Sequence, residues 1–478
     1  MAEGTAQRVL VAGLGVSGRA AVQVLCARGA RVRTYDDRVA DADERDAEAF
    51  LAADGLADVD LVVTSPGLRP DHPVLAAAAA RGVEVISEVE LAWRLRVDRA
   101  GGGGPAPWLA VTGTNGKTTT VGMLASILEA NGERVAAVGN VGSPLVLAAT
   151  DPSLDVLAVE LSSFQLHFTH SMSVQAGAVL NVAPDHIDWH GSLEAYGADK
   201  GRIFERAQVA CVYNAADPAT RRLVEEADVV DGAVAVGFTL GTPSVGQVGL
   251  VEHVLVDRGF ATLRHTHAAE LATLDDLAQL AGPDGHVAPH VVANALAAAA
   301  LALAHGVPPA AVRDGLRAFG PGAHRIATIA TVDGVAYVDD SKATNAHAAA
   351  ASLAAFPEHS VVWIAGGLAK GAAFDELVEA RGDRLVGAVL IGVDRAPLAG
   401  ALARHAPQVP VIEVEPDETG EVVTRAVSAA RGLAAGAPAG TQRTVLLAPA
   451  CASMDQFVSY ADRGDRFAGA VRDLTEGV

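Results

Sequence analysis

At residues 113–119 the chain reads Gly113-Thr114-Asn115-Gly116-Lys117-Thr118-Thr119, directly after an apolar run at 108–111 and directly before a helical pattern at 121–129. Glycines let backbone N–H groups turn toward an anion, and the N-terminus of the following helix adds positive partial charge. The lysine of such a loop reaches the outer phosphates of a nucleotide, and the threonine after it can hold Mg²⁺. The stretch therefore predicts a phosphate-binding loop that handles ATP.

The loop departs from the usual pattern at one position. A glycine normally stands five residues before the second glycine, whereas this chain has Val111 there. A Gly-rich turn with a surface lysine is the alternative interpretation. The order of strand, glycines, Lys-Thr and helix favours the phosphate loop.

Length and charge limit the possible classes of protein. A chain of 478 residues is too long for one ordinary core and predicts about three domains. The formal charge of -21 argues against a nucleic-acid-binding surface, which would be basic.

The cysteines and the apolar runs indicate in which cellular compartment the protein is found. Cys26, Cys211 and Cys451 lie far apart without metal-ligand spacing, which favours a reducing cytoplasm over a disulfide framework. The first residues lack a signal pattern, and the alanine run at 76–80 is too short to span a bilayer. We expect a cytoplasmic, monomeric enzyme without a membrane segment of its own.

The first segment, residues 1–98, carries a second glycine-rich turn. A strand at 8–12 runs into Gly13-Leu14-Gly15-Val16-Ser17-Gly18 and a helix, and a strand at 31–35 ends at Asp36. This is a dinucleotide-binding fingerprint, which by itself suggests an NAD-dependent dehydrogenase. The same geometry also binds a UDP pyrophosphate, because its backbone donors recognise phosphate rather than nicotinamide.

Alternating strands and helices continue through the rest of the chain. Residues 99–107, with four consecutive glycines, are typical of a flexible linker. The second segment, 108–322, has strand patterns at 155–160, 176–182 and 209–213. The third, 323–478, has them at 335–339, 361–365, 386–391 and 444–447. This pattern predicts an α/β protein with a Rossmann-like N-terminal domain, a P-loop ATPase-like central domain with a mostly parallel sheet, and a Rossmann-like C-terminal domain.

Three further residues of the second segment narrow its chemistry. Glu160 ends an apolar strand, where its carboxylate can hold Mg²⁺ or interact with a helix dipole. His186 follows another strand, and by itself it would be assigned a structural role. Lys200 by itself would be assigned to a solvated helix face.

Together, residues 113–119, 160–165, 181–188 and Lys200 resemble the ATP-dependent Mur ligases of peptidoglycan synthesis, and the resemblance covers essentially the whole chain. It implies that ATP and two Mg²⁺ ions bind here, and that Lys200 is carbamylated into a carboxylate-like ligand. A carbamate forms from the neutral amine, so the surroundings of this lysine must favour deprotonation. The metal ligands implied by the resemblance are Thr118, Glu160, His186 and Lys200. The implied ATP site comprises Gly113, Thr114, Asn115, Gly116, Lys117, Thr118, Thr119, Asn294, Arg325 and Asp340.

The same resemblance makes the first segment a UDP-sugar domain. A dehydrogenase has no need for the phosphate loop, Glu160 or His186, so these residues disfavour that alternative. The implied UDP-substrate residues are Gly13, Leu14, Gly15, Ser17, Gly18, Asp36, Asp37, Arg38, Ser65, Pro66, Gly67, Asn140 and Ser162.

Within the family, the third segment resembles the members that add D-glutamate. The resemblance rests on the runs at 339–345 and 448–457, and the Asp-Asn-Pro-Arg signature of the diaminopimelate- and lysine-adding relatives is not found in the sequence. Folylpolyglutamate synthases share the phosphate loop but resemble the 340–345 run less closely. The implied amino-acid-binding residues are Lys342, Thr344, Lys370, Ser453, Met454 and Tyr460. The implied catalytic residues are Lys117, Glu160, His186, Lys200, Arg325 and Lys342.

We therefore expect a ligase that uses ATP to join D-glutamate to UDP-N-acetylmuramoyl-L-alanine through an acyl phosphate, releasing ADP and phosphate. Closure of the third segment around a hinge at 320–324 would bring the reacting groups together. A nucleotide-dependent switch without coupling chemistry is the remaining alternative. Charged residues gathered at strand ends in three segments argue for catalysis.

Overall fold

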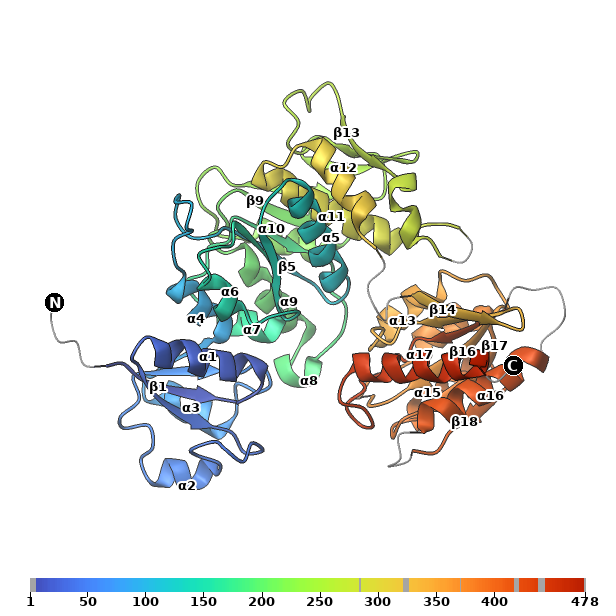
Figure 1. The fold of residues 1–478 in the computed structure, drawn as a ribbon, viewed down its shortest axis with the longest axis horizontal. Helices are drawn as coiled ribbons and strands as arrows, with labels where there is room; N and C mark the ends of the chain where they lie inside the picture. The colour runs from blue at the N-terminus through green and yellow to red at the C-terminus, as the bar shows by residue number, and fades with distance from the viewer. Residues whose placement is uncertain are drawn as a thin grey trace. The chain divides into compact units, whose positions relative to one another are not determined.

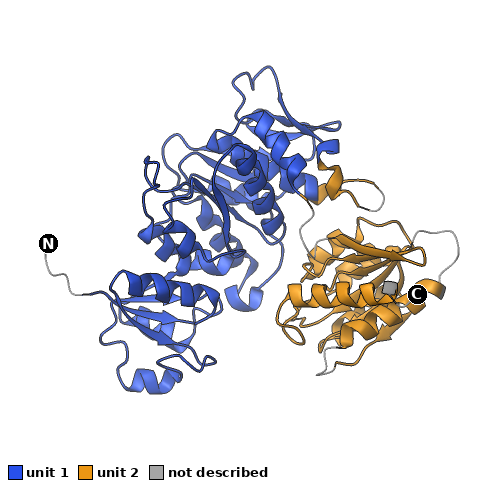
Figure 2. Ribbon diagram, in the orientation of Figure 1, with its two compact units in different colours: residues 1–276, 291–319 blue, residues 277–290, 320–478 orange. Residues whose placement is uncertain are grey.

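The computed structural model describes residues 6–282, 285–320, 326–369, 371–416, 421–436 and 443–476 of the chain (Figure 1). They form two compact units (Figure 2). Unit 1 comprises residues 1–276 and 291–319, and unit 2 comprises residues 277–290 and 320–478.

Unit 1 begins with a four-stranded parallel sheet of order β2-β1-β3-β4 (Figure 1). The central strand β3 is buried along its whole length and β1 from Val9 to Ala12, because helices cover both faces of a parallel sheet. The strands are β1 (Arg8–Ala12), β2 (Arg31–Tyr35), β3 (Leu61–Thr64) and β4 (Glu84–Ser87). The helices are α1 (Val16–Ala27), α2 (Ala47–Ala52), α3 (Pro73–Ala80) and α4 (Glu88–Leu95).

The second sheet of unit 1 has nine strands in the order β13-β12-β11-β10-β9-β8-β5-β7-β6. It is parallel from β6 to β11, and β12 and β13 extend it antiparallel. Its strands are β5 (Trp108–Thr112), β6 (Val135–Gly139), β7 (Val156–Glu160), β8 (Ala176–Val179), β9 (Ala210–Asn214), β10 (Val234–Phe238), β11 (Gln247–Val251), β12 (Val254–Asp257) and β13 (Ala269–Thr273).

The helices of this second sheet include the alanine-rich α11, most of whose residues are buried. The α-helices are α5 (Lys117–Ala130), α6 (Leu145–Ala149), α7 (Ser163–His167), α8 (Ile187–His190), α9 (Leu193–Gly201), α10 (Pro218–Glu225), α11 (Pro289–His305) and α12 (Pro309–Ala318). Short 3₁₀ helices are η1 (Arg202–Phe204) and η2 (Leu274–Leu280).

One hydrophobic core runs continuously from the first sheet into the second, through the apolar face of α4. Two buried carboxylates on α4 reinforce the junction. Glu88 accepts a hydrogen bond from the backbone N–H of Val146 at 2.6 Å, and Glu90 accepts the backbone N–H groups of His170 and Ser171. The two sheets therefore share one compact unit, and the three-domain division at 98 and 322 stays a prediction.

The glycine-rich segment at 99–107 contains a hydrogen-bonded turn, and its role as a linker stays a prediction. The backbone N–H of Arg99 donates to Gly104 O at 3.1 Å, and its guanidinium donates to Gly103 O at 2.9 Å. A bridge pairs Asp98 with Pro105. Glycines 102 to 104 supply the left-handed backbone that closes the turn.

Unit 2 contains a six-stranded sheet of order β14-β15-β19-β16-β17-β18, parallel except for the β14–β15 pair. Its strands are β14 (Ala327–Val332), β15 (Val335–Asp339), β16 (Val361–Gly366), β17 (Leu385–Ile391), β18 (Val411–Glu413) and β19 (Arg443–Leu447). Its helices are α13 (Ala346–Leu353), α14 (Asp375–Arg381), η3 (Gly382–Arg384), α15 (Ala396–His405), α16 (Val422–Gly436) and α17 (Tyr460–Glu476). Separate apolar clusters pack on the two faces of the sheet.

The α/β class with mostly parallel sheets, expected from the sequence, is confirmed. One expected strand is too long: the 176–182 pattern ends at Val179 as β8, because the next residues turn away to bind the phosphate loop. Among the described residues, no helix combines the length and the apolar character needed to cross a membrane.

Candidate active site

The phosphate loop connects β5 to α5, and β5 lies between β8 and β7 in the nine-stranded sheet. Gly116 precedes the helix with a left-handed φ of 85°, a conformation that favours glycine. A Cβ added at Gly116 would lie 2.4 Å from Asn294 Oδ1. The helix α11 therefore presses Asn294, an expected ATP-binding residue, directly against the loop.

Asn181 anchors the phosphate loop from the next strand. Its backbone O accepts the N–H of Thr114 at 3.1 Å, and its side-chain Oδ1 accepts the N–H of Asn115 at 2.9 Å. The hydroxyl of Thr114 lies 3.2 Å from Tyr196 OH. These bonds hold the loop in one shape, which is what an anion-binding cradle requires.

Two lysines converge on one carbonyl oxygen of the loop. Lys117 Nζ donates to Gly113 O at 2.9 Å, and Lys200 Nζ donates to the same oxygen at 3.0 Å. Lys200 is 1% exposed, so burial, followed by the nearby charge of Lys117, holds its pKa well below the ordinary value. The site therefore favours a neutral Lys200 amine, and the 4.3 Å approach of its Nζ to the Tyr196 ring is not a full cation–π contact.

Glu160 ends β7 beside these lysines and is 1% exposed. Its Oε1 accepts a hydrogen bond from Asn140 Nδ2 at 2.8 Å, whereas its Oε2 is buried without a hydrogen-bond partner among the described residues. The charge of Glu160 also acts to raise the pKa of Lys200, so the two side chains lie within electrostatic range. A buried carboxylate oxygen without a donor is costly unless a cation occupies the position, so Glu160 fits a magnesium ligand.

His186 has a left-handed φ of 52° at the start of α8. Its ring packs edge-on against Phe164 with centroids 4.8 Å apart, and it lies near Tyr196 of α9. The three α-helices α7, α8 and α9 thus bring His186 to the side of the site that holds Lys200.

A histidine–aspartate network, which sequence reasoning missed, ties these helices together. Asp199 lies 2.9 Å from His167 Nδ1 and 2.9 Å from His190 Nδ1, and His190 Nε2 lies 3.0 Å from Ser163 Oγ. Burial alone would raise the pKa of Asp199, but the two histidine contacts outweigh it and lower the pKa. The network fixes the helix that carries Lys200, and no single residue in it stands out in the sequence.

In the described part of the chain, no three His, Cys, Asp or Glu side chains gather into a ready metal site. The expected ligand set does not need such a group, because Thr118 and a modified Lys200 belong to it. Within this set, Glu160 contributes a buried oxygen, Oε2, that has no hydrogen-bond partner among the described residues.

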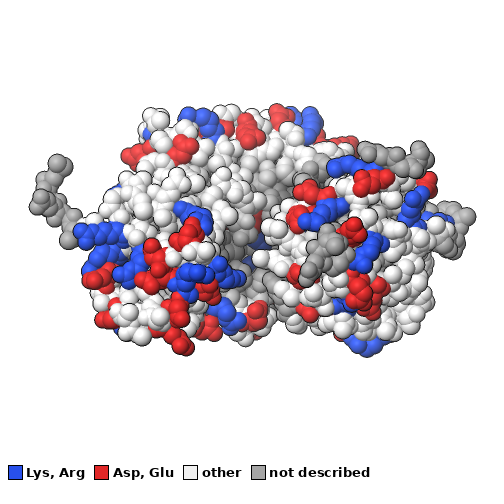
Figure 3. Space-filling view, turned by 60° about the horizontal axis from the view of Figure 1, so that its bottom comes forward, with Lys and Arg blue, Asp and Glu red and all other residues white. Residues whose placement is uncertain are grey.

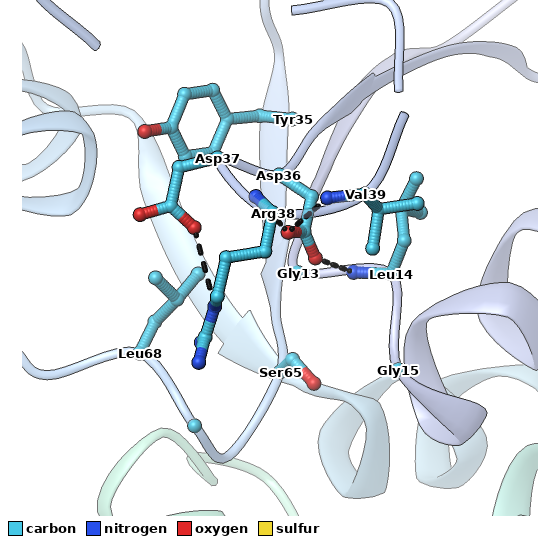
Figure 4. Close-up of a pocket in the computed structure, with 11 residues that line it drawn as sticks. Gly13, Leu14, Gly15, Tyr35, Asp36, Asp37, Arg38, Val39, Ser65 and Leu68 are labelled. Carbon is cyan, nitrogen blue, oxygen red and sulfur yellow. Dashed lines mark hydrogen bonds and ion pairs between the residues drawn. The ribbon is translucent and has the colours of Figure 1, made fainter. Parts of the chain in front are cut away.

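A pocket of about 290 Å³ opens at the carboxyl ends of the strands of the first sheet (Figure 4). Its lining includes most of the expected UDP-substrate residues. Ser17, Gly18 and Pro66 are outside the lining, and Asn140 and Ser162 lie just after strands β6 and β7 of the second sheet. The lining residues are Gly13, Leu14, Gly15, Tyr35, Asp36, Asp37, Arg38, Val39, Ser65, Gly67 and Leu68.

Asp36 shapes this pocket through backbone contacts. Its carboxylate accepts the N–H groups of Leu14 at 2.7 Å, Arg38 at 2.9 Å and Val39 at 3.1 Å (Figure 4). Burial alone would raise the pKa of Asp36, but these three donors outweigh it and lower the pKa. Asp36 therefore holds the glycine-rich loop in place, and Arg38 extends beside Asp37 at the pocket mouth.

Four of the expected amino-acid residues, Lys342, Thr344, Ser453 and Met454, lie in the loops that follow β15 and β19, which are neighbours in the sheet. Lys342 Nζ lies 4.0 Å over the Tyr460 ring. Ser453 is buried and Met454 is 74% exposed. Thr344 follows Lys342 in the same loop, its N–H donating to Lys342 O at 2.8 Å.

Three expected positions need separate mention. Asp340 is buried and its carboxylate accepts a hydrogen bond from Ser352, so its ATP-binding role stays a prediction. Arg325 and Lys370 lie outside the described residues, as do residues 321–324 of the expected hinge at 320–324. Arg463, which no sequence pattern singled out, lies fully buried between the two loops of this site.

Acidic and basic side chains are interspersed on the face shown in Figure 3. Several arginines of the first sheet's surface pair with carboxylates, including Arg8 with Asp60 at 2.7 Å and Arg19 with Asp41 at 3.0 Å. Exposed pairs of this kind contribute little stability, but they neutralise the basic side chains.

Comparisons with known proteins identify the family. A profile described as Mur ligase middle domain matches residues 111–302, and one described as Mur ligase MurD-like, N-terminal domain matches residues 7–87. The chain is 58% identical to a UDP-N-acetylmuramoylalanine--D-glutamate ligase of Streptomyces avermitilis, with 98% of each chain covered. It is 52% identical to the protein of the same name from Thermobifida fusca, again with 98% of each chain covered.

Solved structures show the same fold at low sequence identity. The UDP-N-acetylmuramate-alanine ligase MurC of Thermotoga maritima is 18% identical, with a TM-score of 0.56 over 98% of this chain and 99% of that chain. FolC of E. coli is 20% identical, with a TM-score of 0.55 over 81% of this chain and 92% of that chain. The extent and identity of the curated matches show that the chain belongs to the Mur ligase family, in the group of UDP-N-acetylmuramoylalanine--D-glutamate ligases.

Proposed function

We propose that this chain is an ATP-dependent ligase that joins D-glutamate to UDP-N-acetylmuramoyl-L-alanine. The observation that carries the proposal is the meeting of Lys117 and Lys200 at Gly113 O, beside a buried Glu160 oxygen without a hydrogen-bond partner. Such a group suits phosphoryl transfer, in which catalysis is mostly positioning and charge stabilisation. The name of the full-length relatives, which are 46–58% identical, supports the choice of substrates.

A free carboxylate is a poor electrophile, so the substrate's carboxylate must first be activated. The γ-phosphoryl group of ATP passes to a carboxylate oxygen of the substrate's alanyl group, and ADP leaves. The D-glutamate amine attacks the carbonyl carbon of the resulting acyl phosphate, loses a proton, and the C–O bond to phosphate breaks. Lys117 spreads the negative charge that develops during the first transfer, and Arg325 is assigned the same task.

Thr118, Glu160, His186 and Lys200 would hold magnesium, which when bound neutralises charge on the phosphates. Lys200 takes part after carbamylation, in which its neutral amine adds to CO₂ and loses a proton. Burial and the charge of Lys117 both favour that neutral amine. The carbamate would give the lysine an oxygen ligand, the kind that Mg²⁺ prefers.

The other substrates are assigned to separate sheets. The pocket around Asp36 would take the uridine diphosphate, with the backbone N–H groups at the start of α1 facing its phosphates. The loops that carry Lys342, Thr344 and Ser453 would take D-glutamate, together with Lys370, Met454 and Tyr460. The cytoplasmic location and the monomeric state stay predictions.

Phosphate release from ATP tests the proposal. Purified protein receives Mg²⁺ and UDP-N-acetylmuramoyl-L-alanine with D-glutamate, L-glutamate, L-lysine or diaminopimelate in parallel. We expect release only with D-glutamate, together with a product whose mass is the sum of the two substrates less one water. Release with another amino acid would keep the ligase chemistry and refute the assigned specificity. No release with any of them would refute the proposed function.

A further inference from the structure

Arg463 is a fully buried arginine in the first turns of α17. Its guanidinium donates three hydrogen bonds: from Nε to Ser341 Oγ at 2.9 Å, from Nη2 to Ser341 O at 2.9 Å, and from Nη1 to Cys451 O at 3.3 Å. Ser341 Oγ in turn donates to Tyr460 O at 2.8 Å. One side chain therefore joins the start of α17 to the loops that follow β15 and β19.

These two loops carry the residues assigned to the amino-acid substrate. Ser341 immediately precedes Lys342, and Cys451 lies two residues before Ser453. The loops also contact each other directly, because Ala450 N donates to Ala343 O at 2.9 Å. Arg463 lies beneath the point where they meet, and the ring of Tyr460 on the same helix lies under Lys342.

The charge of Arg463 has no direct partner. Among the described residues, no carboxylate lies within ion-pair distance of its guanidinium. Asp339 and Asp455 act on it electrostatically, but Asp339 Oδ1 accepts Ser341 N and Asp455 Oδ2 accepts Val393 N. Burial lowers the pKa of Arg463 to about 10, which leaves it protonated at neutral pH.

An unpaired buried cation is expensive, and a well-packed apolar residue of the same volume would often be as stable. The hydrogen bonds to Ser341 and Cys451 satisfy its donors, and Asp339 and Asp455 oppose its charge without contacting it. The substrate assigned to the loops above carries two carboxylates and one ammonium group, so its net charge is opposite to that of Arg463. A buried cation that no carboxylate of the described residues contacts is therefore suited to an anionic ligand.

We propose that Arg463 is a positioning residue for the amino-acid substrate. Arg463 holds the 341–344 and 451–453 loops together, and the carboxylates of the substrate neutralise its positive charge. The inference rests on the proposed function, because it takes the substrate to be an acidic amino acid. It concerns Arg463 alone and does not depend on magnesium or on Lys200.

The test measures steady-state kinetics of Arg463→Met, Arg463→Lys and the control Arg466→Met. Arg466 lies on the same helix, pairs with Asp462 at the surface, and its loss removes the same formal charge. For Arg463→Met we expect the KM for D-glutamate to rise by at least about tenfold, with the KM values for ATP and the UDP-substrate within twofold. Arg463→Lys keeps the charge and should stay within about threefold of the wild type, and Arg466→Met should match the wild type.

Equal increases in all three KM values, or an unchanged KM for D-glutamate in folded Arg463→Met, would overturn the inference. If Arg463→Met does not fold, the Arg463→Lys variant decides. A tenfold increase in the KM for D-glutamate in folded Arg463→Lys, which keeps the positive charge, would also overturn the inference. The wild-type enzyme is measured first, so that failure of the proposed function is seen separately. If the wild type couples a different amino acid, the variants are compared with that one.

Discussion

Gly18→Ala is expected to damage the first-sheet pocket, although Gly18 itself does not line it. Gly18 lies in the first turn of α1, where an added Cβ would be 1.9 Å from Gly13 O and 2.9 Å from Gly13 C. The obstacle is backbone, so no side chain can rotate away. Reaching even a 3.0 Å contact requires a separation of about 1 Å between the helix and the Gly13–Gly15 loop.

Two effects set the size of the change in stability. Overpacking of this kind costs about 1–3 kcal/mol, and alanine gains roughly 1 kcal/mol over glycine in a helix. The free energy of unfolding should therefore fall by about 0–2 kcal/mol, the difference between these two effects. Binding should suffer more, because a shift of about 1 Å moves the loop N–H donors away from the pyrophosphate and can cost about 100-fold.

The assay measures the KM for the UDP-substrate at saturating ATP and D-glutamate, together with urea unfolding. We expect that KM to rise by about 10- to 100-fold, while the KM for D-glutamate stays unchanged. Gly469→Ala on α17 is the matched control, because its added Cβ meets nothing within 4 Å. A Gly18→Ala protein with a wild-type KM for the UDP-substrate would refute the reasoning.

Three further changes test the second sheet and its junction with the first. Glu160→Gln removes the charge beside the Lys200 amine; we expect phosphate release to fall by at least about 100-fold and the Mg²⁺ requirement to rise, whereas thermal stability should not fall. An unchanged Mg²⁺ titration would argue against Glu160 as a ligand. Lys200→Ala should lose activity and regain part of it with added acetate, and full activity without any added carboxylate or CO₂ would disprove the carbamate. Glu88 has its pKa raised by burial from 4.5 to about 7, so the folded state binds the extra proton. The stability that this protonation contributes is fully present below pH 4.5 and is lost as the pH rises through 7. Between pH 4.5 and 7 the wild type should therefore lose on the order of 3 kcal/mol more unfolding free energy than Glu88→Gln, as measured by urea titration at each pH. Parallel pH profiles for the two proteins would contradict this prediction.

The buried strands were predictable from the sequence, and most of the strands near sheet edges were not. The strand predicted at 335–339 coincides with β15. A strand that is covered on both faces has a mostly apolar sequence, which is easy to recognise. The edge strand β18 is exposed along its length, and β6 and β14 are partly exposed, so they carry a weak apolar signal. Strands β10 to β13 were also not predicted from the sequence. The glycine and proline residues between β10 and β11 are typical of a loop, so the sequence gives no sign that the sheet continues there.

In the candidate site too, some residues could be identified from sequence motifs, and others only from the packing of the folded chain. Glu160 and Lys200 were identified by motif, and the structure adds why they suit their roles: one has a buried oxygen without a donor, the other a buried amine. Asp199 and Arg463 could not be found in this way, because an aspartate or arginine in a helical run of charged residues is typical of a solvated face. Only the packing of α9 and α17 shows that these two are buried.

The overall charge of the chain gives these local arrangements a common explanation. All three proposed substrates are anionic, whereas the protein carries a formal charge of -21, so its general field disfavours their approach. Each site must therefore supply its own positive potential at close range. The first sheet uses backbone N–H groups that Asp36 holds in place, and the second uses the phosphate loop with Lys117. In unit 2, Lys342 at the surface of the loops and Arg463 beneath them would serve the same purpose. All these groups lie at the carboxyl ends of parallel strands, where loops from adjacent strands converge and few charges are needed to define a site.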